Sequence, residues 1–197
     1  MTKGGYKKYR TNLKHNDMKI VYYILLASLM LFSSCEKKNF ANDILKMQSR
    51  PIDLTTCEGA VCYENGERTT YSSADSAYQL IIYVDSTSCS PCFISHMYDY
   101  KKTVEYFDSA GIRTLFVFEP SHDKVEDVMS YLEQQNNPFL SIVVRDGGFA
   151  SANPHLPQSS MLHSFLLNEK NEVVVVGNPA RNNKVKELML NTMKSQK

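Results

Sequence analysis

The eight residues DSTSCSPC, at 85–92, decide the expected fold. They follow an apolar run, LIIYV at 80–84, that is typical of a buried strand, and they precede a segment with helical periodicity. The first turn of a helix has free backbone N–H groups, which favour the thiolate form of a cysteine. Pro91 suits that turn because its missing N–H is not needed there. The stretch therefore predicts a strand, a tight turn and a helix, with Cys89 and Cys92 as a redox-active pair.

From residue 76 onward the chain alternates between strand and helix patterns. Strands are expected at 79–85, 114–118 and 140–144, a hairpin at 165–167 and 173–176, and helices at 91–108, 124–135 and 182–194. Alternation of this kind pairs the central strands in parallel, and the final hairpin adds antiparallel strands. We therefore expect an α/β fold with a mixed central sheet flanked by helices.

The amino end has the layout of a secretory signal peptide. Met18 and the lysine after it are followed by an apolar run at 20–32, which leads to Ser-Ser-Cys at 33–35. The run is shorter than the roughly 20 residues of a transmembrane helix, and its ending is similar to the lipobox of bacterial lipoproteins. We expect residues 1–34 to be a signal peptide, with Met18 as an alternative start, and Cys35 to carry the lipid, including palmitate. An uncleaved signal anchor is the alternative.

Without residues 1–34 the chain is acidic. The whole chain has 22 Lys/Arg and 21 Asp/Glu, and residues 1–34 hold six of the cations and one of the acids, which leaves a net charge of −4. This balance offers no basic patch and argues against nucleic-acid binding. About 160 residues remain, enough for one domain with a core.

Two segments separate the signal peptide from the alternating region. Residues 35–50 are polar and predict a lipid-anchored tether, or a short amphipathic helix at 40–47. Residues 51–75 predict a small β-rich segment with a hairpin turn at 64–67, because Asn-Gly favours the tight turns of hairpins.

Cys57 and Cys62 lie in this β-rich segment. In an oxidising compartment two nearby cysteines usually form a structural disulfide, and together with Cys89 and Cys92 they make an even set of four. We expect a structural disulfide between Cys57 and Cys62; a catalytic relay with the active pair, or two free thiols, are the alternatives.

The order βαβα and then ββα, with CxxC after the first central strand, resembles the thioredoxin fold. The resemblance covers residues 76–197 and is carried by LIIYVDSTSCSPC, TLFVFEP and HSFLLNEKNEVVVVGNP. The N-terminal extension is similar to that of membrane-tethered TlpA-like or ResA-like thiol–disulfide oxidoreductases.

This resemblance implies an enzyme of the bacterial cell envelope, periplasm-facing or surface-exposed, that needs no cofactor. It implies that Cys89 is the attacking thiolate and that Cys92 is the resolving thiol. From their positions on the helix we expect Cys89 at its exposed end and Cys92 screened one turn in. The implied partners are protein thiols or disulfides and a redox partner protein, with the membrane reached through the lipid anchor.

Three positions depart from the pattern of that family. Ser88 stands where an aromatic residue usually precedes the first cysteine, and Tyr83 stands where many members carry a buried acid. Asp85 is an alternative acid on the same face of the strand. Leu162 aligns with the family's cis-proline, unless Pro157 serves in another loop register. Because a non-proline cis bond costs ~2.5–4 kcal/mol, we expect a trans peptide and an altered substrate groove.

The absent proline keeps a metal-handling alternative open. His163 would lie beside it, near both sulfurs, and His96 follows Cys92 by one helical turn. Two thiolates with one or two imidazoles suit copper or zinc. In this alternative Cys89, Cys92 and His163 are the metal ligands.

A peroxiredoxin-like peroxidase is a further alternative. Ser86 matches the hydroxyl position of the PxxxTxxC motif, whereas Ile82 stands where the proline is expected. An inactive thioredoxin-fold binding module is the remaining one.

Overall fold

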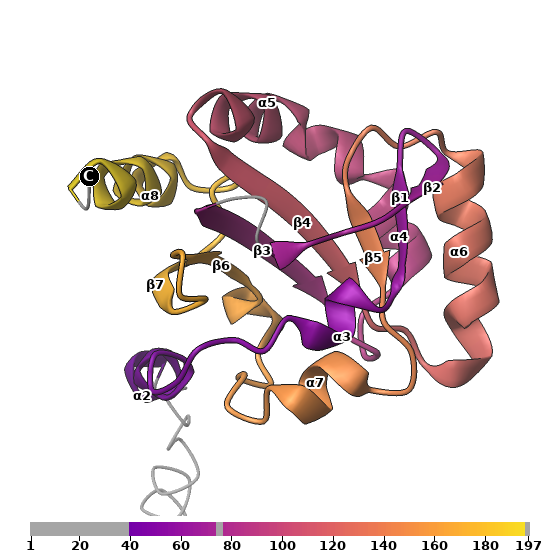
Figure 1. The fold of residues 1–197 in the computed structure, drawn as a ribbon, viewed down its shortest axis with the longest axis horizontal. Coiled ribbons are helices and arrows are strands. Elements are labelled where there is room, and N and C mark those ends of the chain that lie inside the picture. Colours follow the sequence, from indigo (N-terminus) through magenta and orange to yellow (C-terminus); the bar gives the residue numbers. More distant parts are fainter. Residues whose placement is uncertain (1–39, 74–76, 196–197) are drawn as a thin grey trace, which may run out of the picture. The chain divides into compact units, whose positions relative to one another are not determined.

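A seven-stranded mixed sheet forms the centre of the computed structural model, which describes residues 40–73 and 77–195 (Figure 1). The strands are β1 Val61–Glu64, β2 Glu67–Thr69, β3 Tyr78–Val84, β4 Ile112–Phe118, β5 Ser141–Val143, β6 Ser164–Leu167 and β7 Val173–Val176. The helices are α2 Phe40–Met47, α3 Thr55–Glu58, α4 Ser90–Ser95, α5 Lys101–Ser109, α6 Val125–Gln134, α7 Gly148–Ala152 and α8 Asn183–Ser195, with 3₁₀ turns η2 Met97–Tyr100, η3 His122–Lys124 and η4 Ser160–Leu162.

The strand order is β2-β1-β5-β4-β3-β6-β7. β3, β4 and β5 run parallel, while β6 and β7 on one side and β1 and β2 on the other are antiparallel to their neighbours. The prediction of an α/β fold with a mixed sheet flanked by helices is confirmed.

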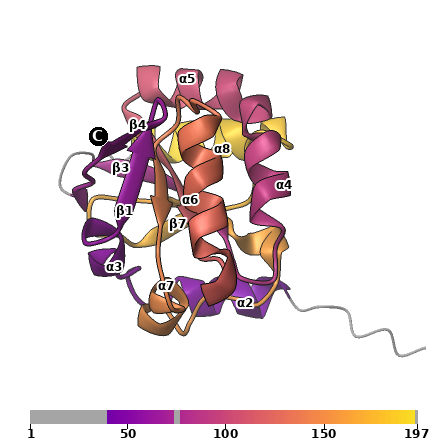
Figure 2. The same ribbon diagram turned by 90° about the vertical axis from the view of Figure 1, so that its right-hand side faces the viewer.

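The side chains of β3 alternate between two cores, as the period of two in a strand requires. Leu80, Ile82 and Val84 belong to the core that α4, α5, α6 and α8 cover, and Figure 2 shows α4 beside α6 on this face. Ile81 and Tyr83 belong to the core on the opposite face of the sheet, here called the second core, which α2, α3 and α7 help to cover. All seven residues of β3 are buried, which explains why the strand reads as a continuous apolar run.

The helix expected at 91–108 is divided into α4, η2 and α5. His96 separates α4 from η2, and its φ of −106° and ψ of 4° lie outside the helical range. In a 3₁₀ turn residues i and i+3 eclipse, so η2 directs Met97 and Tyr100 together into the core. The periodicity of Met97, Tyr100, Val104 and Phe107 could not show this break, because the same residues are buried with or without it.

The N-terminal hairpin extends the sheet instead of standing apart from it. β1 pairs with β2 and also with β5. The turn expected at 64–67 is present, with positive φ at Asn65 (54°) and Gly66 (74°). Two successive left-handed residues are the mark of the tight turns that suit hairpins.

α2 is the amphipathic helix that was the alternative to a tether. Met47 is fully buried, and Phe40 and Ile44 pack against the second core. Just after the helix, the Gln48 side chain donates a hydrogen bond to the Val173 carbonyl. The tether predicted for 35–50 therefore does not extend through α2.

The predicted signal peptide at 1–34 and Cys35 lie outside the described residues. Within the described ranges, no helix is long and apolar enough to cross a membrane.

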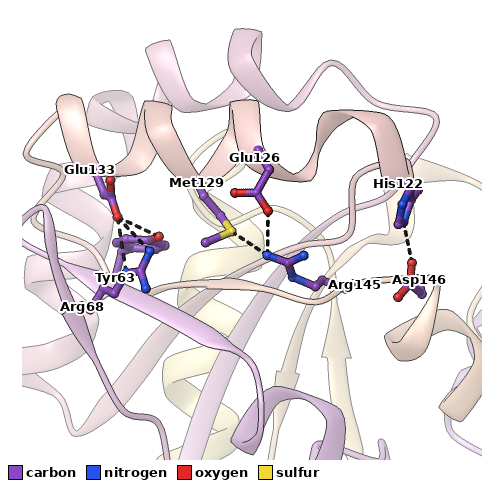
Figure 3. Close-up of polar contacts among 8 residues, drawn as sticks. All are labelled: Tyr63, Arg68, His122, Glu126, Met129, Glu133, Arg145 and Asp146. Carbon is purple, nitrogen blue, oxygen red and sulfur yellow. Dashed lines mark hydrogen bonds and ion pairs between the residues drawn. The ribbon is translucent and has the colours of Figure 1, made fainter.

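Polar contacts join α6 and the 3₁₀ turn before it to other segments of the protein (Figure 3). They join Tyr63 and Arg68 to Glu133, Arg145 to Glu126 and Met129, and His122 to Asp146. The Tyr63 hydroxyl donates a hydrogen bond to Glu133 Oε1 over 3.0 Å and so links β1 to α6. The Arg68–Glu133 and Arg145–Glu126 ion pairs are exposed to water, which screens them, so they contribute little to the stability of the fold.

Gly66→Ala should lower the free energy of unfolding by about 1–2 kcal/mol or more. Gly66 has a φ of +74°, which costs an L-residue about that much, and an added Cβ would lie 3.0 Å from Asn136 Cα and 3.1 Å from the Glu133 carbonyl oxygen. Urea denaturation followed by circular dichroism measures the change. Gly59→Ala is the matched control, because its Cβ would meet nothing within 4 Å; an equal loss in both variants would contradict the assignment.

Candidate active site

Cys89 and Cys92 lie where β3 leads into α4. β3 ends at Val84, residues 85–88 form the turn, and Cys89 is the N-cap residue of α4. The two cysteines form a disulfide with a Cα–Cα distance of 5.3 Å. The structure thus brings together the two residues that were predicted from the sequence to be catalytic.

Asp85 organises the turn that carries Cys89. Its Oδ1 accepts hydrogen bonds from the Thr87 backbone N–H (3.1 Å), the Thr87 hydroxyl (2.8 Å) and the Ser88 hydroxyl (2.8 Å). Partial burial alone would raise the pKa of Asp85, but these hydrogen bonds and the nearby His163 hold the pKa below its ordinary value. Asp85 therefore stays ionised at neutral pH and fixes the turn, as an aspartate at the start of a loop commonly does.

Both cysteines are exposed, which corrects the expectation that Cys92 is screened. The buried positions of α4 are Ser90 and Ile94, four residues apart on one face of the helix. Cys89 and Cys92 lie on the other side of this short helix. Exposure therefore does not distinguish an attacking sulfur from a resolving one.

A cavity of about 590 Å³ borders both cysteines. Phe93 and Tyr100 form part of its wall, with ring centroids 5.8 Å apart, and Arg181 lines it from the segment that precedes α8. The pair therefore opens to solvent through a partly aromatic recess on the α4 side.

A buried acid is present, but it is Glu119 at the end of β4 and not residue 83. Glu119 is only 2% exposed. Its Oε2 accepts a hydrogen bond from the Tyr83 hydroxyl, and its Oε1 accepts hydrogen bonds from the backbone N–H groups of Phe149 (2.6 Å) and Ala150 (3.3 Å). Burial and the Glu119 carboxylate raise the pKa of Tyr83, so the phenol stays protonated and donates.

Sequence reasoning missed Glu119 because it follows β4 directly and precedes a proline, which is equally typical of a solvated strand end. Its burial depends on α7, a five-residue helix too short to leave a periodic pattern. An acid after a buried strand was the one available indication.

His163 is buried and holds the loop opposite the turn. Its Nε2 donates to the Pro157 carbonyl oxygen over 2.8 Å, because a carbonyl can only accept. Its Nδ1 has no hydrogen-bond partner and lies 3.7 Å from Asp85 Oδ2. Its ring packs on Tyr83 with centroids 4.8 Å apart.

These contacts do not form the alternative metal site of Cys89, Cys92 and His163. His163 engages Asp85 and Pro157, and it does not line the cavity that borders the sulfurs. Across residues 40–73 and 77–195, no three His, Cys, Asp or Glu side chains are grouped to hold a metal ion. His96 projects to solvent, with its Nδ1 3.9 Å from Asp99.

Leu162 has the trans peptide that was expected, since no described peptide bond is cis. It is buried at the end of η4, while its neighbour Met161 is 72% exposed. Pro157 does not replace the family proline in this structure; its carbonyl anchors His163.

A second cavity, of about 580 Å³, lies on the far side of the turn. Asp85, Glu119 and His163 contribute to its lining, and so does Ser86. The hydroxyl that the peroxidase alternative requires therefore opens to a different cavity from the one that borders Cys89.

Cys57 and Cys62 are free thiols, so the structural disulfide expected between them is not formed in this structure. Both fill space in the second core as small apolar residues do. Burial, with the neighbouring Cys62, raises the pKa of Cys57 to about 12, and burial also raises the pKa of Cys62. Neither lines the cavity at Cys89 and Cys92, so their placement does not support a catalytic relay with that pair.

No protein-family model matches the chain, and no curated protein matches it. Among solved structures it is similar to the thioredoxin domain of a thiol–disulfide oxidoreductase from Bacteroides vulgatus, with 14% identity, a TM-score of 0.45, and coverage of 71% of this chain and 98% of that one. It is similar to peroxiredoxin Q from Xanthomonas campestris, with 18% identity, a TM-score of 0.49, and coverage of 76% and 98%.

A third similar structure is a Chlorobium tepidum protein described as a thiol:disulfide interchange protein DsbE, with 17% identity, a TM-score of 0.45, and coverage of 67% and 90%. Thiol–disulfide oxidoreductases are thus among the solved structures that the chain resembles.

Glu119→Gln should lower the free energy of unfolding by about 2–4 kcal/mol, because it removes a charge-assisted acceptor and turns an amide donor toward backbone donors. Urea denaturation of the full-length protein measures the change. Glu126→Gln is the matched control: this acid pairs with Arg145 at an exposed site, and its loss should cost about 1 kcal/mol or less. A small and equal loss in both variants would show that the Glu119 carboxylate is not an internal anchor.

Proposed function

We propose that the protein is a thiol–disulfide oxidoreductase that acts by dithiol/disulfide exchange at Cys89 and Cys92. The observation that carries this proposal is the bonded cysteine pair at the start of α4, exposed beside a cavity. A structural disulfide would be expected to join distant parts of the chain or to be buried, whereas this one joins two exposed cysteines that are only three positions apart.

The exchange needs only the two sulfurs and a partner. In the reduced protein the thiolate of Cys89 attacks a substrate disulfide, forms a mixed disulfide and expels one substrate thiolate. Cys92 then attacks Cys89, which releases the second substrate thiolate and leaves the protein oxidised. Cys89 is favoured for the first step because, as the N-cap, it adjoins the free N–H groups of the first turn.

The proposal extends to where this exchange takes place. The lipobox-like ending at Cys35 supports a lipid-anchored protein of the bacterial envelope, facing the periplasm or the cell exterior. Its partners there would be protein thiols or disulfides and a protein that resets the pair. An oxidising compartment is also where an exposed disulfide persists.

Cys92→Ser should accumulate mixed disulfides through Cys89 when the reduced protein is mixed with a disulfide substrate, whereas Cys89→Ser should accumulate few. The second sulfur normally resolves the intermediate, so its removal leaves the intermediate intact. Non-reducing electrophoresis and peptide mass spectrometry identify the linked residue.

Cys57 and Cys62 provide an internal control for this experiment. Their burial and raised pKa values should protect them from alkylation at neutral pH until the protein is denatured. A reduced pair that reacts no faster than these two thiols, and forms no mixed disulfide, would contradict exchange at Cys89 and Cys92.

Cys35→Ser should abolish palmitate labelling in a bacterial host and move the protein out of the membrane fraction, because the lipid is attached through that sulfur. Cys57→Ser serves as the control and should keep the label. Labelling that persists in Cys35→Ser would overturn the anchor and leave the redox proposal untouched.

A further inference from the structure

The cavity of about 590 Å³ beside the disulfide, here named the Cys92 cavity, also presents two opposite charges. Arg181 and Asp99 both line it, together with Cys92 and the aromatic rings of Phe93 and Tyr100. Arg181 is exposed and forms no salt bridge with any described residue. Asp99 has only a loose contact, 3.9 Å from His96 Nδ1. One cation and one anion are thus available to a ligand that reaches the sulfur.

Asn178 holds the arginine at this position. Its Nδ2 donates a hydrogen bond to the Tyr100 hydroxyl over 2.7 Å. Its Oδ1 accepts from the Ala180 N–H over 3.0 Å, and its carbonyl accepts from the Arg181 N–H over 3.3 Å. The backbone segment that carries Arg181 is therefore tied to the Tyr100 wall of the cavity.

We propose that the Cys92 cavity binds a small zwitterionic thiol of the amino-acid type, or its disulfide. The ligand carboxylate pairs with Arg181, the ligand ammonium pairs with Asp99, and the ligand sulfur meets Sγ of Cys89, which also lines the cavity. This inference rests on the proposed function and adds a substrate class to it. A cysteine within a protein chain fits less well, because its amino and carboxyl groups are bound in peptide bonds and carry neither charge.

The exchange balances with two ligand molecules. A ligand thiolate attacks Sγ of Cys89, forms a mixed disulfide there and expels Cys92 as a thiolate. A second ligand thiolate attacks the ligand sulfur of that mixed disulfide, which releases the ligand disulfide and leaves Cys89 as a thiolate. Two ligand thiols lose two electrons and two protons, and the protein disulfide becomes a dithiol.

The test measures how fast oxidised full-length protein is reduced by four thiols at equal thiolate concentration. Cysteine carries both charges, N-acetylcysteine carries the carboxylate alone, cysteamine carries the ammonium alone, and 2-mercaptoethanol carries neither. Acid quenching, alkylation and mass spectrometry follow the reaction. The wild type should prefer cysteine, and the adduct trapped at early times should be on Cys89.

Two substitutions test the contributions of the Arg181 and Asp99 charges separately. Arg181→Gln should lower the ratio of the cysteine rate to the 2-mercaptoethanol rate by roughly threefold to tenfold, the range of one charge-assisted contact near the surface. Asp99→Asn should lower the ratio of the cysteine rate to the N-acetylcysteine rate by a similar factor. Lys184→Gln, an exposed cation outside the cavity lining, is the control and should leave both ratios unchanged.

Equal rates for the four thiols in the wild type, or ratios that Arg181→Gln and Asp99→Asn leave unchanged, would overturn the inference. An early adduct found only on Cys92 would do the same. Dithiothreitol distinguishes this failure from that of the proposed function: a pair that dithiothreitol reduces readily keeps its exchange activity even where the selectivity is absent. A pair that resists dithiothreitol overturns both.

Discussion

The parallel pairing of β3 with β4 is the constraint on which the site depends. The two strands stay in register over seven residue pairs, from Tyr78 with Ile112 to Val84 with Phe118. The Glu119 N–H then donates to the Val84 carbonyl oxygen over 2.9 Å, which carries the ladder one step past the end of the strands. Because parallel strands end at the same edge of a sheet, the turn that carries Cys89 and the buried acid Glu119 emerge side by side.

Glu119 shows how that edge accommodates a charge inside the protein. A buried carboxylate is costly unless hydrogen bonds replace its water. Here the backbone N–H groups at the start of α7 and the Tyr83 hydroxyl supply them. The buried acid thus follows the strand next to β3, and Tyr83 donates a hydrogen bond to it. The same carboxylate fixes α7 against the sheet.

The features that could be predicted from the sequence are those that long, regular patterns determine. The buried run of β3, the helices around it and the CxxC turn follow from hydrophobic periodicity and the rules for helix termini. The trans peptide at Leu162 follows from the cost of a non-proline cis bond. Three features depend on tertiary packing that leaves no local pattern. The break at His96, the burial of Glu119 beneath α7 and the two free thiols at Cys57 and Cys62 each arise from neighbours distant in sequence.

The exposure of Cys92 follows from the same packing. Because Ser90 and Ile94 face the core, helical geometry directs Cys92 outward. The chain leaves the α-helical conformation at His96, and η2 then buries Met97 and Tyr100. The aromatic wall built by Phe93 and Tyr100 then lies next to the second sulfur. On the opposite side of the turn, His163 Nδ1 lies 3.7 Å from Asp85 Oδ2, and both residues line the second cavity. The disulfide is therefore bordered on one side by an open cavity and held on the other by the residues that fix its turn, so its reactive surface and its structural support come from different parts of the chain.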